Sequence, residues 1–588
     1  MTATSTPAPS PAGIPPAGTR LARHVAVVIP LGLLAVGAWS RRWTSDDGFI
    51  NLRIVEQLWA GNGPVWNATE RVETGTSPLW LAVLTVVGAV VRFVAVEWVS
   101  VALGIACTIG GLAAATAAAR LLHRPTGRLL VPVGALVVAA LPPFWDFASS
   151  GLETGLSFLW LGLCGWALAA AASTVGVTGQ RAAATAALLG LGPLVRPDLA
   201  LISVTTLLAL LVLHGWPGWR RSGLVVAAAG VLPVAYQLFR MAYFAALVPN
   251  TAFAKEGSAS RWDVGWSYAG DFTGTWRLWW PALAVVVVAA VALGPRARTV
   301  DRPGLVVVAG LTAGAALHAL YVVRVGGDFM HARLLLPATF TALLPWALLP
   351  LRRATAAAGA LLLPWAVLAA TSWEPAGRPE AGQGPTADVV VDERSYYVSA
   401  RRPHPVTAAD FGGGRYAEAG RRAATVVDEG RGALTLRTFT PEDEDTWSPL
   451  RDPAAPFAVW VDNIGIFGFL AGPEVTVIDA RGLGDPVTGR FRLAERGRPG
   501  HEKAASPAWV VGRHGAPGSS PPDGEVDPAA IAAARDAVAC GELAEILEAV
   551  TGRLTPSRAA TNIVLSLRSY GLRFSADPFT AREELCDR

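Results

Sequence analysis

The sequence predicts a polytopic α-helical membrane protein that carries a soluble α/β domain at its carboxyl end. Hydrophobic residues make up 52% of its 588 residues, and the mean hydropathy of +0.40 is too high for a soluble enzyme of this length. Apolar segments long enough to cross a bilayer recur as far as residue 371, and the chain becomes polar from about Trp373 onward. The net charge is +4, and the basic residues are spread between loops and tail, so nothing indicates nucleic-acid binding.

The amino-terminal residues divide into an arm and a first helix. Residues 1–23 are rich in Ala, Thr, Ser and Pro, which predicts a disordered cytoplasmic arm. The apolar segment 24–40 could be mistaken for a signal peptide, but Gly37-Ala38 is a weak cleavage site and many more apolar segments follow. We therefore interpret this segment as an uncleaved transmembrane helix.

Ten further segments could cross the bilayer, which predicts about eleven transmembrane helices in a domain of residues 24–372. Some of them are short and must be supported by neighbouring helices. The ten segments are 98–119, 129–145, 152–172, 182–195, 198–214, 222–240, 278–294, 304–323, 333–350 and 354–371.

One apolar stretch, 77–96, is not counted among these spans. If it crossed the bilayer, the Arg-rich loop 120–128 would lie outside, against the tendency of basic loops to face the cytoplasm. If it lies along the membrane surface, the other Arg-rich loops all face the cytoplasm. We therefore interpret 77–96 as an interfacial helix within a long outer loop of residues 41–97.

Two adjacent carboxylates, Asp46 and Asp47, follow the first helix directly and open this outer loop. Acidic residues at a membrane surface are functional-site candidates, and two like charges side by side repel each other. Their presence favours a role such as proton abstraction or cation binding. The alternative is a polar helix terminus that faces solvent.

Several cationic residues lie in loops that we expect on the outer side, although basic residues in loops usually face the cytoplasm. Four of them could neutralise a phosphate: Arg196, Lys255, His331 and Arg333. Ion pairs with Asp198 or Asp328 are the alternative explanation for the two arginines. Acids lie on the same side, and we add Glu153 and Asp328 to the candidate substrate-binding residues.

These groups suit a transferase that takes a sugar from a polyprenyl phosphate, the form in which cells export sugars across membranes. Such an enzyme needs a base for the acceptor hydroxyl and cations for the departing phosphate. It also needs a groove between helices for the lipid tail. Asp46 or Asp47 fits the base, and the roles within the pair stay open.

The order of the parts resembles the GT-C membrane glycosyltransferases, and the motifs closely resemble those of the AftB family of terminal β-(1→2) arabinofuranosyltransferases. The matching stretches include Asp46-Asp47-Gly48, Ser150-Gly151-Leu152-Glu153, Leu194-Val195-Arg196-Pro197, Leu232-Pro233-Val234-Ala235-Tyr236-Gln237, Ala254-Lys255, Gly326-Gly327-Asp328-Phe329-Met330-His331, Val391-Asp392-Glu393-Arg394 and Gly500-His501-Glu502-Lys503. Residues 1–23 and 51–59 match poorly.

The resemblance implies a GT-C fold in the plasma membrane with Asp46 and Asp47 as the functional centre, and it adds Tyr236 to the candidate substrate-binding residues. It implies decaprenylphosphoryl D-arabinofuranose as the donor. The implied acceptor is the non-reducing ends of arabinan in arabinogalactan and lipoarabinomannan. Donor and product linkages in this family are both β, which implies retention of configuration.

Three other interpretations of the sequence are possible. A transporter would show an internal repeat and acids in the middle of its spans, and a non-enzymatic scaffold would not need the acid pair together with outer cations. A GT-C enzyme that uses another sugar, such as mannose, is the closest alternative, because the donor identity depends on resemblance alone. No cofactor or metal ligand set is assigned, and a divalent cation stays an open alternative.

Residues 373–588 predict an exported soluble domain of mixed α/β structure, with strands near 458–461 and 475–478 and helical periodicity over 528–550. This domain holds Cys540 and Cys586 as its only cysteines. A compartment outside the membrane permits disulfides, so we expect these two to be bonded to each other. The alternative is two free thiols in separate environments.

Overall fold

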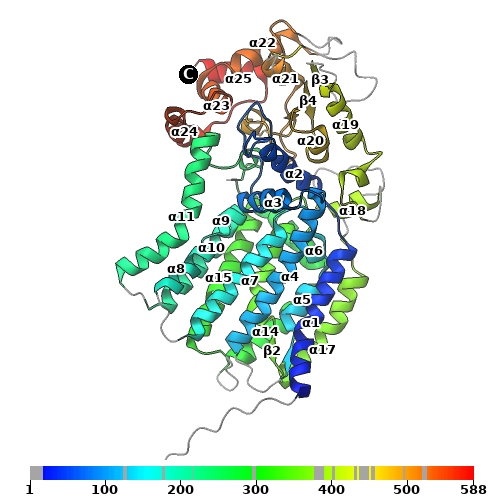
Figure 1. Cartoon of the computed structure of the whole chain (residues 1–588), viewed down its shortest axis with the longest axis vertical. Helices are drawn as coiled ribbons and strands as arrows, with labels where there is room; N and C mark the ends of the chain where they lie inside the picture. Colours follow the sequence, from blue (N-terminus) through cyan, green and yellow to red (C-terminus); the bar gives the residue numbers. More distant parts are fainter. Residues whose placement is uncertain are drawn as a thin grey trace, which may run out of the picture.

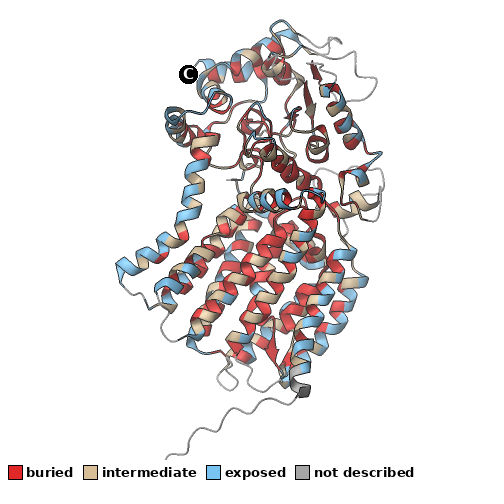
Figure 2. Ribbon diagram, in the orientation of Figure 1, coloured by how far each residue is buried: buried red, intermediate tan, exposed pale blue. Residues whose placement is uncertain are grey.

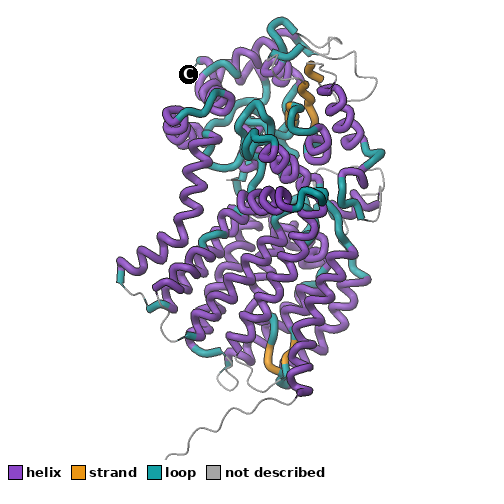
Figure 3. The backbone as a smooth tube through the Cα atoms, in the orientation of Figure 1, coloured by secondary structure: helices purple, strands orange, loops and turns teal. Residues whose placement is uncertain are grey.

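The computed structural model describes residues 17–123, 129–174, 179–215, 218–257, 259–294, 300–375, 390–399, 404–428, 433–435, 449–451, 457–493, 497–519 and 526–587. A bundle of helices forms one half of the molecule, and residues 373–588, here called the tail, cover one end of it (Figure 1). We call this the tail-facing end of the bundle. Figure 3 shows that helices dominate both halves.

The bundle consists of long helices interrupted by shorter pieces. Its helices are α1 (Ala17–Ser40), α4 (Val96–His123), α5 (Val133–Ala140), α6 (Pro142–Asp146), α7 (Thr154–Ser173), α8 (Gly179–Leu189), α9 (Gly192–Val195), η1 (Pro197–Leu199), α10 (Ala200–Leu213), α11 (Trp219–Phe244), α13 (Trp262–Thr275), α14 (Trp279–Leu293), α15 (Arg302–Val325), η2 (Arg333–Leu335), α16 (Leu336–Leu343), η3 (Leu344–Trp346) and α17 (Arg353–Thr371). Two short strands, β1 (Leu130–Val131) and β2 (Leu349–Pro350), pair antiparallel at the end farther from the tail (Figure 1).

Six helices of the described chain are long and apolar enough to cross a membrane, namely α1, α4, α7, α11, α15 and α17. A seventh span arises if α13 and α14, which meet at an angle of 84°, are counted as one. The several apolar helices are those of a membrane protein. The count of eleven stays a prediction, because the remaining segments are shorter than a full span.

The segments predicted at 129–145 and 333–350 are broken rather than single helices. The first consists of α5 and α6, and the second consists of η2, α16 and η3. Both start or end at the β1–β2 pair, and their other ends lie at the tail-facing end, where Arg41 Nε donates to Asp146 Oδ1 at 2.6 Å. Each segment therefore runs between the two ends of the bundle, with its gaps filled by packed neighbours.

The outer loop supplies α2 (Asp46–Trp59) and α3 (Pro78–Val90). Ser45 caps α2 by accepting from the N–H of Gly48, and Pro78 stands in the first turn of α3, where no N–H is needed. In Figure 1, α3 lies across the ends of the bundle helices rather than among them. This orientation fits an interfacial helix.

The tail combines a small parallel sheet with helices. Its elements are α18 (Glu393–Ser399), η4 (Ala408–Phe411), α19 (Arg415–Asp428), β3 (Ala433–Thr435), β4 (Phe457–Val461), α20 (Gly465–Ala471), β5 (Thr476–Asp479), η6 (Thr488–Arg490), α21 (Pro507–His514), α22 (Pro528–Ala537), α23 (Gly541–Thr551), α24 (Pro556–Arg568), η7 (Ser569–Gly571) and α25 (Pro578–Cys586). The strands run in the order β3-β4-β5, all parallel. A disulfide joins Cys540 to Cys586.

The tail is fastened to the bundle by a shared core and by buried polar contacts. One apolar core extends from the bundle through Phe49 of α2 to Phe411 and Val459 of the tail, and a second core lies between the strands and the later tail helices. The Arg53 side chain of α2 is fully buried and donates to the carbonyl oxygens of Gly472 at 2.7 Å and Val475 at 2.8 Å. Figure 2 shows the resulting buried zone between the two halves.

Candidate active site

A cavity of about 400 Å³ lies at the junction of the bundle, the outer loop and the tail. Its walls come from the start of α2, the turn before α7, the turns that follow α9 and α15, helix α12 (Asn250–Ala254) and two parts of the tail. The residues with ionisable or aromatic side chains on these walls are Asp47, Glu153, Arg196, Asp198, Phe253, Lys255, Tyr321, Asp328, Arg333, Tyr570 and Arg573. The structure therefore brings together six of the nine residues that the sequence assigns to catalysis or substrate binding.

The acid pair splits at the start of α2, because successive side chains on a helix point about 100° apart. Asp46 is 6% exposed and turns toward the tail, where it accepts from the backbone N–H groups of Gly465 at 3.0 Å and Ile466 at 2.8 Å. Burial raises the pKa of Asp46 to about 7, the N–H of Ile466 opposes the rise, and the charge of Asp47 adds to it. Asp46 does not line the cavity, so its position is that of a contact between α2 and the tail.

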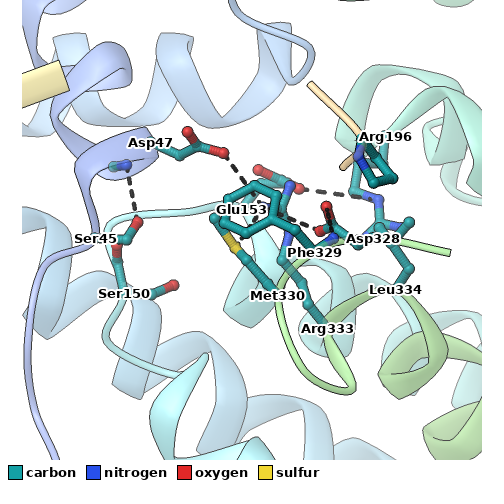
Figure 4. Close-up of polar contacts among 12 residues, drawn as sticks. Ser45, Asp47, Ser150, Glu153, Arg196, Asp328, Phe329, Met330, Arg333 and Leu334 are labelled. Carbon is teal, nitrogen blue, oxygen red and sulfur yellow. Dashed lines mark hydrogen bonds and ion pairs between the residues drawn. The ribbon is translucent and has the colours of Figure 1, made fainter. Parts of the chain in front are cut away.

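Asp47 faces the cavity instead. Its side chain is 24% exposed, and its Oδ2 lies 3.5 Å from Nη1 of Arg333 (Figure 4). Thus the two acids, which the sequence treats as one unit, occupy different environments. Of the two, Asp47 is the carboxylate that a bound substrate can reach.

Glycines allow α2 to lie close to the turn before α7 and to the start of α20. A Cβ on Gly48 would lie 2.5 Å from the carbonyl oxygen of Ser150, and one on Gly465 would lie 1.9 Å from the carbonyl oxygen of Asp46. Both distances are too short for any side chain, so α2 is held tightly between the turn before α7 and the start of α20. The position of Asp47 is fixed by this packing.

Arg196 and Arg333 form the cationic wall of the cavity. Arg196 is bound to Asp198, with Nε 2.9 Å from Oδ1 and Nη2 2.5 Å from Oδ2, and lies 3.9 Å from Glu153. Arg333 lies 3.5 Å from both Asp47 and Asp328. Ion pairing, the alternative explanation for both arginines, is therefore present, and it does not remove either one from the cavity.

Both guanidinium groups keep unused donors. Nη1 of Arg196 and Nε of Arg333 are buried and have no hydrogen-bond partner within the described part of the chain. Buried donors of this kind are usually satisfied. Two carboxylate oxygens of the same cavity, Glu153 Oε1 and Asp328 Oδ2, likewise have no hydrogen-bond partner among the described residues.

His331 and Tyr236 lie away from the cavity, contrary to the substrate-binding positions expected for them. His331 Nε2 accepts from Trp276 Nε1 at 2.8 Å, and its Nδ1 lies 2.5 Å from Asp271 Oδ2. Tyr236 donates to Glu73 Oε1 at 2.7 Å. Each is held by a buried partner distant in sequence, which the motifs alone could not indicate.

Several residues near the cavity were not expected from the sequence. His318 on α15 is fully buried, with Nε2 2.6 Å from Asp198 Oδ2, so it supports the carboxylate that holds Arg196. Tyr570 and Arg573 reach the cavity from the tail. Glu393 is buried, and burial together with the charges of Asp47 and Asp46 raises its pKa well above the usual range. The Val391–Arg394 motif was the only signal for Glu393.

No group of three or more His, Cys, Asp or Glu side chains in the described segments could hold a metal ion. The charges that surround the cavity pair with one another as arginine–carboxylate contacts.

Comparison with known proteins gives consistent matches over nearly the whole chain. A family model described as the AftB family C-terminal domain matches residues 422–584. The terminal β-(1→2)-arabinofuranosyltransferase of Mycobacterium tuberculosis is 33% identical over 618 aligned positions, which cover 95% of this chain and 96% of the relative. The protein of the same name from Corynebacterium glutamicum is 34% identical over 582 positions, which cover 91% and 84%. No solved structure matches the chain.

These matches confirm the resemblance indicated by the motifs. They span the bundle, the outer loop with its acid pair and the tail, and both relatives bear the name of a glycosyltransferase. The chain is a glycosyltransferase, and it belongs to the AftB family.

Proposed function

We propose that this chain transfers D-arabinofuranose from decaprenylphosphoryl arabinofuranose to the non-reducing ends of cell-wall arabinan, forming terminal β-(1→2) linkages. The observation that carries the proposal is the cavity in which Asp47 faces Arg333 and Arg196 at the tail-facing end of the bundle. The names of the two relatives supply the sugar and the linkage.

The site has the groups that such a transfer needs. The bond between C1 of the arabinose and the phosphate oxygen breaks, and the electron pair leaves with the polyprenyl phosphate. The acceptor hydroxyl oxygen bonds to C1 and gives up its proton, for which Asp47 is the base. Unused N–H groups of Arg196 and Arg333, together with the ammonium of Lys255, stabilise the charge that develops on the leaving phosphate.

Asp46 has a positioning role in this scheme. Its two hydrogen bonds to the start of α20 hold α2 against the tail, and that contact sets the direction of Asp47 one residue later. Asp198 acts similarly on Arg196, through the paired contacts at 2.9 and 2.5 Å. The reacting carboxylate and the phosphate-binding arginine are thus both preorganised.

The proposal includes an orientation in the plasma membrane. The Arg-rich loops lie in the cytoplasm, and the cavity and the tail lie outside, where a lipid-linked sugar replaces nucleotide donors. The bundle then crosses the bilayer about eleven times, since the broken segments run between the same two ends as the long helices.

The experiment compares Asp47→Asn with the unaltered full-length chain in detergent or lipid nanodiscs. Synthetic polyprenylphosphoryl arabinofuranose and polyprenylphosphoryl mannose serve as donors, with an arabinofuranosyl oligosaccharide as acceptor. We expect transfer of arabinose only, and a loss of about 10²–10⁴ in rate for Asp47→Asn. The matched control is Asp536→Asn, whose carboxylate is 59% exposed on the tail. Mannose transfer by the unaltered chain, or normal turnover of Asp47→Asn, would contradict the proposal.

A further inference from the structure

The lining of the cavity has two chemically different parts. The bundle side carries Arg196 and Arg333 among the carboxylates of Asp47, Glu153, Asp198 and Asp328. Another part of the lining comes from the tail as Tyr570 and Arg573, together with Phe253 of α12. The first part consists of ion pairs and the second includes aromatic rings, so the two suit different parts of a ligand.

Phe253 organises the tail-side wall. It is 1% exposed, its ring centroid lies 6.0 Å from that of Tyr570, and the guanidinium carbon of Arg573 lies 5.1 Å from the same centroid. The wall is therefore a preformed arrangement of two aromatic rings and a guanidinium plane. Tyr570 remains 39% exposed, which leaves part of its ring open to a ligand.

Arg573 is ion-paired at this wall and shares the carboxylate of Glu256 with Lys503. Its Nε lies 3.0 Å from Glu256 Oε1, and the ammonium of Lys503 lies 2.6 Å from the same oxygen. Hydrogen bonds from both cations lower the pKa of Glu256, so its carboxylate stays ionised. A cation bound in this way attracts a second anion weakly, while its remaining N–H groups can still donate to hydroxyl oxygens.

Neutral sugars match this surface. Their C–H faces pack on the electron-rich faces of aromatic rings, and their hydroxyl groups accept from planar N–H donors. A phosphate would use only the N–H donors and a lipid chain only the rings, whereas a sugar uses both. A donor phosphate at Arg196 and Arg333 would leave the rings of this wall to a neutral glycan.

We propose that Tyr570 and Arg573 form the subsite that binds the neutral glycan acceptor, with its terminal furanose ring against Tyr570. This inference depends on the proposed function for the identity of the sugar, and it assigns acceptor recognition to residues of the tail. It gives the tail a direct part in substrate binding.

The test measures initial rates with polyprenylphosphoryl arabinofuranose and a synthetic arabinofuranosyl oligosaccharide, each varied in turn. Tyr570→Ala should raise the KM for the acceptor on the order of tenfold and leave the KM for the donor within about twofold. Tyr570→Phe, which keeps the ring, should stay close to the unaltered chain. Arg573→Lys, which keeps the charge beside Glu256 but loses the planar donor, should raise the acceptor KM as well.

The tail offers matched controls. Phe579 is 38% exposed and Arg582 has a side chain 44% exposed, and neither lines the cavity. Phe579→Ala and Arg582→Lys should leave both KM values unchanged. An unchanged acceptor KM in Tyr570→Ala, or a rise confined to the donor KM, would overturn the inference.

Direct binding separates this inference from the proposed function. The synthetic oligosaccharide is titrated without donor into the full-length chain, and tryptophan fluorescence reports binding. Binding to the unaltered chain that is weakened about tenfold in Tyr570→Ala supports the subsite even if no arabinose is transferred. Equal binding to both proteins, or none to either, refutes it even if transfer is observed.

Discussion

The adjacent carboxylates of α2 should respond differently to mutation, because only one of them faces the cavity. Asp46→Ala leaves the buried N–H groups of Gly465 and Ile466 without their acceptor. Each unsatisfied buried donor destabilises by about 1–3 kcal/mol, so the pair amounts to about 2–6 kcal/mol of contact between α2 and the tail. For a cooperative unit of about 200 residues, this corresponds to a Tm at least about 4 °C lower.

Asp47→Asn should show the opposite pattern. Its carboxylate is part-exposed, and its nearest cation, Arg333, also lies 3.5 Å from Asp328, so stability should change little. Arabinosyl transfer should fall by about 10²–10⁴. The assays are thermal unfolding followed by tryptophan fluorescence and transfer rates at saturating donor. The reasoning fails if Asp46→Ala keeps the normal Tm and loses transfer as completely as Asp47→Asn.

Three further predictions concern charge and covalent structure. Burial raises the pKa of Asp46 from its ordinary value near 3.8 to about 7, so the folded chain takes up a proton that the unfolded chain does not. The resulting stabilisation of the fold is complete below the ordinary pKa of an aspartate and is lost as pH rises through 7. The Tm measured from pH 5 to 8 should therefore fall more in the unaltered chain than in Asp46→Asn. Parallel curves of Tm against pH for the two proteins would exclude this titration. Arg196→Lys and Arg333→Lys should each raise the KM for the lipid phosphate donor about tenfold without changing the acceptor KM, because an ammonium cannot replace the planar donors; unchanged donor KM values would remove the phosphate from this wall. The Cys540–Cys586 bond closes a sequence separation of 46 residues and should stabilise the tail by about 4 kcal/mol in the chain-entropy model, so alkylation without reductant followed by intact-mass analysis should find both cysteines blocked, and two alkylated tail cysteines would refute it.

The sequence predicted the site best where charge broke an expected pattern. Cations are unusual in loops that are predicted to face outward, and three such residues, Arg196, Lys255 and Arg333, all line the cavity with Asp47. The apolar spans were visible because hydrophobic runs of full length are unambiguous. The breaks within segments 129–145 and 333–350 could not be predicted in this way, since residues distant in sequence pack into their gaps.

Other parts of the site could not be predicted because their partners lie far away along the chain. His331 is held by Asp271 and Trp276, while Tyr236 is held by Glu73. No local pattern distinguishes a motif residue that binds substrate from one that binds a neighbouring helix. Tyr570 is likewise an ordinary aromatic residue in a soluble helical region until the fold brings it to the cavity.

Asp46 contacts the tail and Asp47 lines the cavity, so the two neighbouring acids connect the tail and the cavity into one structural unit. Asp46 and Asp47 are neighbours on α2, so any shift of α20 that pulls on Asp46 also turns Asp47, about 100° around the same helix. Arg53 reinforces this link two turns later by binding the carbonyl oxygens of Gly472 and Val475. Because the apolar core is continuous from Phe49 to Phe411, the tail cannot move as a separate body without exposing that core. The direction of Asp47 therefore depends on the docked tail, and under the proposed function this links acceptor binding by the tail to the carboxylate that reacts.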